Sequence, residues 1–94
     1  MQELTIIQKN FFETLQYIQE QVVSNMISTY NNNNEMEDLF YEITFDVIVE
    51  ILLMIDGYND NMMKIDLIDL NSKKSIKENI ELHDECTKYL KFGI

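Results

Sequence analysis

Residues 4–30, LTIIQKNFFETLQYIQEQVVSNMISTY, decide the fold because they carry one long helical pattern. The apolar side chains that recur at steps of three and four residues are Leu4, Ile7, Phe11, Leu15, Ile18, Val22 and Met26. This spacing places them on one face of an α-helix. It also approximates an 11-residue repeat, which keeps the face nearly straight. We therefore predict a helix over 4–30, about 40 Å long, with Thr5 or an earlier residue as its N-cap.

A second helix is expected over about 35–56. Four asparagines at 31–34 favour a loop before it, and Asn34 fits the N-cap position. The expected buried face consists of Leu39 or Phe40, Ile43, Val47, Ile51 and Met54, extended by Ile48, Leu52 and Ile55. The β-branched content would also suit a strand, but a strand of this length is unusual in a small domain. Gly57 is the expected C-terminal glycine of this helix.

The last third of the chain mixes two patterns. Residues 64–70 alternate for part of their length, which predicts a short strand or extended segment before a turn at 71–74. A lone strand leaves its backbone groups unpaired, so it must be irregular, pair within the domain or pair with another chain. Ser75 and Glu78 match a capping box, so we predict a third helix from Ser75 to about Phe92. The sequence thus predicts a mainly α, three-helix bundle-like domain with one short extended segment or strand between the second and third helices.

Length and cysteine content bound the class of protein. Ninety-four residues form one domain, here a single helical domain over 1–94. Cys86 is the one cysteine, so no internal disulfide is available and a cytoplasmic location is expected. No signal-peptide pattern and no apolar run of membrane-spanning length is visible. The absence of Ala, Arg and Pro, with abundant Asn, Ile and Lys, indicates an AT-rich genome, bacterial or phage.

The net charge of −10 is concentrated in one part of the chain. Residues 1–9 and 64–94 are neutral, whereas 10–63 hold ten acids and no lysine or arginine. Those acids are Glu13, Glu20, Glu35, Glu37, Asp38, Glu42, Asp46, Glu50, Asp56 and Asp60. Such a charge repels nucleic acid and anionic membranes and attracts basic proteins. Solubility alone is the simpler interpretation, but a merely soluble surface usually mixes both signs.

The predicted partner-binding residues lie mainly on the second helix. Its acids are spaced so that several fall on one side, and tyrosine is favoured at protein interfaces. The residues predicted to bind the partner are Glu35, Asp38, Glu42, Asp46, Glu50, Tyr41 and Tyr58. We expect a basic protein as the partner, with no direct contact to nucleic acid or membrane.

Catalytic and metal-binding motifs are not apparent. His83 is the one histidine, and on a helix it cannot converge with its immediate neighbours Asp84, Glu85 and Cys86 on one ion. A partly buried or capping role is the simpler interpretation of His83, and Cys86 fits a small buried residue. Residues 56–61 lack the ordered acidic positions of a calcium loop. We therefore predict no catalytic residue, no metal ligand, no cofactor and no enzymatic activity.

The C-terminal part carries a resemblance to a known class. Residues 65–69, 75–76, 80–84 and 89–90 read IDLID, SI, IELHD and YL. These stretches resemble the ends of small acidic immunity proteins associated with bacterial toxin loci. The resemblance implies a stoichiometric inhibitor that masks the active site of a toxin, and it assigns no functional residue.

Three functional hypotheses follow from the sequence. The first is a non-catalytic protein-binding inhibitor, an immunity protein that neutralises a basic, nuclease-type bacterial toxin. The second is a helical homodimer with a structural or regulatory role, formed through the face of 4–30 or through strand pairing at 65–70. The third is a phage nucleic-acid mimic that inhibits a defence nuclease, which would have the same charge signature as the first.

Overall fold

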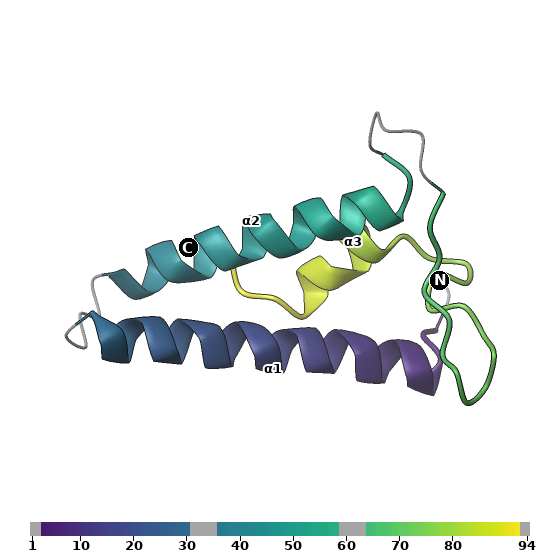
Figure 1. Cartoon of the computed structure of the whole chain (residues 1–94), viewed down its shortest axis with the longest axis horizontal. Helices are drawn as coiled ribbons and strands as arrows, with labels where there is room; N and C mark the ends of the chain where they lie inside the picture. The colour runs from purple at the N-terminus through teal and green to yellow at the C-terminus, as the bar shows by residue number, and fades with distance from the viewer. Residues whose placement is uncertain (1–2, 31–35, 59–63, 93–94) are drawn as a thin grey trace.

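The computed structural model describes residues 3–30, 36–58 and 64–92, and its architecture is helical (Figure 1). Helices α1 (Ile6–Thr29) and α2 (Glu37–Ile55) run antiparallel and diverge toward the start of α1. The C-terminal segment is residues 64–92. Its first part lies beside the end of α2 and the start of α1, and its later part, with α3 (Leu82–Glu85) and the 3-10 turn η2 (Cys86–Lys88), runs back between the two helices. The mainly α class and the two predicted long helices are confirmed.

The start of α1 forms a capping box. The Thr5 Oγ1 accepts a hydrogen bond from the Gln8 amide at 3.1 Å, and the Gln8 Oε1 accepts one from the Thr5 amide at 2.9 Å. Each side chain therefore satisfies a backbone donor that the helix leaves unpaired. This confirms Thr5 as the N-cap of α1.

The end of α2 is fixed by Gly57. Its φ of +92° lies in the left-handed region, where a side chain would be strained. The Gly57 amide donates to the Met54 carbonyl at 3.1 Å, and the Tyr58 amide donates to the Leu53 carbonyl at 3.0 Å. These are the two hydrogen bonds of a Schellman motif, so the predicted C-terminal glycine is confirmed. The predicted N-cap, Asn34, lies outside the described residues.

The predicted third helix over 75–92 is wrong. Only α3 and η2 are helical in that range, and Asn79 has a φ of +62°, which interrupts a right-handed helix. The Gln8 Nε2 also donates to the carbonyls of Ile76 and Glu78, both at 3.0 Å. A helix starting at Ser75 would need those carbonyls for its own amides. The tertiary contact with α1 therefore replaces the local capping-box preference.

Of the predicted short strand or extended segment at 64–70, the strand does not form among the described residues. Ile68 and Ser75 make one isolated antiparallel bridge. The Asp69 amide donates to the Lys74 carbonyl at 2.9 Å, which closes a turn. The Lys77 ammonium anchors this region by donating to the carbonyls of Ile55 at 2.7 Å and Ile65 at 2.8 Å. The backbone groups are thus satisfied within the domain, partly by a side chain.

The core lies where the two long helices meet the C-terminal segment. Its buried members are Phe12, Leu52, Ile55, Ile76, Leu82, Cys86 and Leu90. Phe12 stacks on Tyr89 with ring centroids 5.4 Å apart. Leu52 and Ile55, predicted to extend the buried face of α2, are buried. Of the predicted main face, Phe40 is buried and Met54 packs against the core, as does Ile48. Ile43, Val47 and Ile51 of that face are exposed, contrary to the prediction.

Two buried glutamines hold the C-terminal segment against α1. Gln8 donates to the carbonyls of Ile76 and Glu78 in this segment, as described above. The Gln19 Nε2 donates to the Lys91 carbonyl at 2.7 Å, while the Gln19 Oε1 accepts from the Lys91 amide at 2.9 Å. Both side chains are almost fully buried, so each fixes the register of the segment through paired polar groups.

Candidate protein-binding surface

Four exposed carboxylates form one row along α2. They follow each other at every fourth residue, which places them on one side of a helix. This acidic row consists of Asp38, Glu42, Asp46 and Glu50. It extends over about 18 Å at 1.5 Å per residue. Like charges four residues apart repel each other and destabilise a helix. The acidic row therefore lowers the stability of α2 without serving the fold.

A second row of exposed side chains lies directly beside the first. Each acid is followed in the sequence by a large aliphatic residue, which advances about 100° around the helix. This aliphatic row consists of Leu39, Ile43, Val47 and Ile51, whose exposed fractions lie between 45% and 54%. These are four of the residues that the sequence pattern assigned to the core. Contiguous exposed apolar surface of this kind marks interaction sites.

The contacts of α2 show which way the aliphatic row points. Thr44 faces α1, since its hydroxyl accepts from the Gln19 Nε2 at 3.1 Å. Phe45, the next residue, packs against Phe92 of the C-terminal segment with centroids 4.8 Å apart. Ile43 precedes Thr44, so it lies about 100° from Thr44 around the helix, on the side opposite to Phe45. The aliphatic row therefore borders α1 on the side away from the C-terminal segment.

The same reasoning places two aliphatic residues of α1 on that side. Glu20 follows Gln19 and lines a shallow hollow with Tyr41, next to Lys91 of the C-terminal segment. Ile18 precedes Gln19 and therefore points the opposite way. Ile18 and Val22 are 45% and 40% exposed. We call these two residues and the aliphatic row the open face.

A hollow extends the open face toward the start of α1. It has a volume of about 390 Å³. Its walls include Ile7, Phe11, Leu15 and Ile18 of α1, with Asp69 and Ile76 of the C-terminal segment. The open face is therefore apolar and, at this end, also concave.

Two other predicted interface residues, Tyr41 and Tyr58, contact the C-terminal segment. Tyr41 is half-buried, and the Lys91 ammonium lies 5.2 Å from its ring centroid. Tyr58 is exposed beyond the end of α2, and its hydroxyl donates to Glu81. That hydrogen bond, followed by the charge of Glu81, raises the pKa of Tyr58. Glu35 lies outside the described residues.

Cations of the C-terminal segment do not neutralise the acidic row. The ion pairs within the described part of the chain join His83 to Asp56 and Asp84, and Lys88 to Glu85. The ammonium of Lys77 is engaged with backbone carbonyls. The four carboxylates therefore remain available to a cation from outside the molecule.

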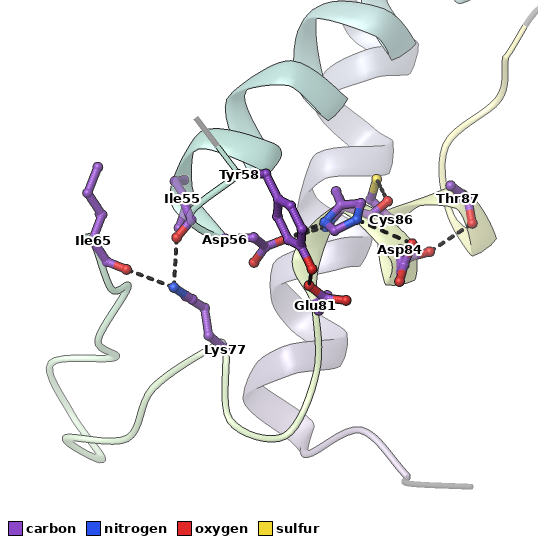
Figure 2. Close-up of polar contacts among 10 residues, drawn as sticks. Ile55, Asp56, Tyr58, Ile65, Lys77, Glu81, Asp84, Cys86 and Thr87 are labelled. Atoms are coloured by element: carbon purple, nitrogen blue, oxygen red, sulfur yellow. Dashed lines mark hydrogen bonds and ion pairs between the residues drawn. The ribbon is translucent and has the colours of Figure 1, made fainter. Parts of the chain in front are cut away.

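A histidine–aspartate pair links the end of α2 to α3 (Figure 2). The Asp56 Oδ2 lies 2.7 Å from the His83 Nδ1 and accepts from the His83 amide at 2.8 Å. The Asp56 side chain is 3% exposed and that of His83 is 18% exposed. The predicted partly buried role of His83 is confirmed, and the pair stabilises the junction of two elements.

Cys86 lies in the core beside this pair. Its Sγ donates to the His83 carbonyl at 3.2 Å (Figure 2). Burial, followed by the charges of Asp56 and Asp84, raises the pKa of the thiol to about 11. A thiol that is both buried and protonated is poorly suited to nucleophilic attack. The predicted packing role of Cys86 is confirmed.

Three potential metal ligands approach each other near His83. Ligand atoms of Glu81, His83 and Asp84 lie within 4.8 Å of one another. Each already has a protein partner, since Glu81 accepts from Tyr58 and the His83 Nε2 lies 3.4 Å from the Asp84 Oδ1. These contacts account for the cluster as a surface polar network.

Sequence reasoning missed the open face and the two buried glutamines. Gln8 and Gln19 are 11 residues apart, so the helical repeat places them on one face and could have marked them as a pair. The open face gave no such signal, because exposed and buried aliphatic residues look alike in the sequence.

Comparisons with known proteins supply no further assignment. No protein-family model matches the chain, and neither curated proteins nor solved structures include a detectable match. Within the described residues, no helix joins enough length to enough apolarity to cross a lipid bilayer. The surface of α2 is therefore the feature from which a function can be argued.

Proposed function

We propose that this protein is a non-catalytic binding protein that inhibits a basic protein partner through α2. The observation that carries the proposal is the acidic row, four exposed carboxylates without an internal cation among the described residues. A row of like charges attracts a surface of opposite charge, accelerates the encounter of the two proteins and fixes their alignment in the complex.

More specifically, we propose that the protein is an immunity-type protein of the cytoplasm and that its partner is a basic, nuclease-type bacterial toxin. A nuclease must present cations where it holds phosphates. A row of carboxylates about 6 Å apart along a helix can occupy such a site in place of the nucleic acid. The single buried thiol, Cys86, agrees with a reducing compartment.

The test begins with affinity purification of the tagged protein from its own host and identification of the partner by mass spectrometry. The dissociation constant of the purified pair is then measured between about 50 and about 300 mM NaCl, a range over which the Debye length falls from above about 10 Å to below about 8 Å. The test variant is Glu42→Gln/Glu50→Gln in the acidic row. The matched control is Glu13→Gln/Glu20→Gln, which removes the same charge from exposed positions of α1.

We expect the row variant to bind at least about tenfold more weakly at low salt, with a shallower salt dependence. The control should keep most of its affinity. Equal losses in the two variants would reduce the role of the row to net charge, and unchanged affinity in both would refute the proposal.

A second candidate function is a structural or regulatory homodimer. The half-exposed open face favours it, since large exposed apolar patches are also used for self-association. Sedimentation velocity across a hundredfold range of concentration tests it (a range that brackets micromolar dissociation constants). A concentration-independent monomer would exclude the dimer, and a dimer lost in Val47→Ser would support it.

A further inference from the structure

The open face and the acidic row together indicate what kind of partner segment would bind to them. We infer that the partner segment is a cationic amphipathic α-helix, which lies along α2 and covers the open face. This inference rests on the proposed function, because it specifies the element that the acidic row would attract.

The C-terminal segment packs against Phe12 of α1 and Phe45 of α2. The open face, in contrast, carries half-exposed aliphatic residues from both helices. Two adjacent helices leave a groove into which the side-chain ridges of a third helix fit. An apolar helix face in such a groove is a recurrent mode of peptide recognition.

Charge on the open face is confined to one border of the groove. The acidic row flanks the aliphatic row on the side away from α1. Along α1, the exposed residues that precede Leu15 and Val22 are Thr14 and Gln21, which are uncharged. The partner helix should therefore carry lysine or arginine along one flank, an apolar centre, and neutral polar residues along the other flank.

The same charges disfavour a second copy of this chain as the occupant. An isologous dimer places the same patch of both subunits in contact. Here both acidic rows would border the same interface, between two chains that each carry a net charge of −10. Anionic membrane surfaces are repelled for the same reason.

The hollow at the end of the open face gives the groove a specific anchoring point. Its walls are mostly aliphatic and aromatic, from Ile7, Phe11 and Leu15, and they include Asp69. A large apolar side chain near one end of the partner helix would fill it. Anchors of this kind dominate the energetics of helix-in-groove complexes.

The experiment uses the full-length chain and synthetic peptides as probes. The first peptide is a leucine–lysine helix of about 18 residues, long enough to cover the acidic row, with all leucines on one face. The second has the same composition in scrambled order, so that no apolar face forms. The third replaces lysine with glutamate. Binding is measured by fluorescence anisotropy at low and moderate salt.

We expect the amphipathic lysine peptide to bind at least about tenfold more tightly than the scrambled one, and the glutamate peptide not to bind. Val47→Ser/Ile51→Ser should remove that advantage. Ile6→Ser/Leu70→Ser is the matched control, because both residues are 77% exposed outside the open face. Circular dichroism shows whether each variant remains folded.

The outcomes separate this inference from the proposed function. Equal binding of the scrambled and amphipathic lysine peptides would overturn the helix inference while leaving electrostatic recruitment intact. Absence of binding by every peptide, or a salt-resistant dimer that blocks the open face, would also overturn it. If the serine variants fail to fold, the comparison of the three peptides on the unmodified chain still decides.

Discussion

The side chain of Gln19 on α1 forms two hydrogen bonds with the backbone of Lys91, 72 residues later in the chain. It accepts from the Lys91 amide and donates to the Lys91 carbonyl, as a neighbouring strand would. The same Nε2 also reaches the Thr44 hydroxyl of α2 at 3.1 Å. One buried side-chain amide thus joins α1, α2 and the C-terminal segment.

Replacing Gln19 should therefore destabilise the protein strongly, even when the new side chain has a similar volume. Gln19→Met keeps the volume but leaves the backbone groups of Lys91 without these partners. We expect the free energy of unfolding in urea to fall by about 1–3 kcal/mol. Gln21→Met on the exposed side of α1 is the control. Equal stability of the two variants would contradict the assigned role of Gln19.

His83 should contribute to stability through Asp56. In His83→Ala, the carboxylate of Asp56 keeps the backbone amide but loses the imidazole, although it is 3% exposed. We expect a loss of about 2 kcal/mol in the free energy of unfolding. Asp84→Asn removes the other, 72% exposed partner of His83 and should change stability by less than about 0.5 kcal/mol. A larger loss of stability in Asp84→Asn than in His83→Ala would show that the pair of His83 and Asp56 is not the stabilising contact.

Acid should weaken the turn region through Asp66. The hydrogen bond from the Ser75 hydroxyl lowers the pKa of Asp66 below 3.8. A carboxyl with a lowered pKa in the folded state stabilises the fold above the unfolded pKa, and this contribution is lost as the pH falls through the folded pKa. The decrease in stability as the pH falls from about 6 through the unfolded pKa of an aspartate, about 3.9, and below it should be smaller in Asp66→Asn. An unchanged decrease would argue against this contact.

The acidic row should cost the protein stability. Glu42 has a like charge four residues away on each side, Asp38 and Asp46. Glu42→Gln removes both repulsive pairs, so thermal or urea unfolding should show a gain of about 0.5 kcal/mol. Glu13→Gln is the control, because Glu13 lies four residues after Lys9 and loses an attraction instead. A loss of stability in Glu42→Gln would mean that the row serves the fold, contrary to our account.

The sequence was sufficient to predict the elements whose signals are local. The apolar spacing predicted α1 and α2, and Thr5 and Gly57 predicted an end of each, because helix caps depend on side chains within a few residues. The acidic row was also visible, since its spacing is a property of α2 alone.

The remaining structure depends on contacts between distant residues. The capping pattern of Ser75 and Glu78 was overridden by Gln8, whose side chain takes the carbonyls that a helix would use. The orientation of α2 was mistaken because its aliphatic residues surround most of the helix. Which of them became buried was decided by where α1 and the C-terminal segment pack, and periodicity within one helix does not contain that information.

The most direct test of the central claim is a methyl NMR titration of the isoleucine-labelled protein with the amphipathic leucine–lysine peptide. Our account predicts that the δ1 methyl signals of Ile18, Ile43 and Ile51 shift together as the peptide is added. The core residue Ile55 and the turn residue Ile68 should show little change. Shifts concentrated at Ile68, with the methyl groups of α2 unaffected, would contradict the proposal that the partner binds along α2.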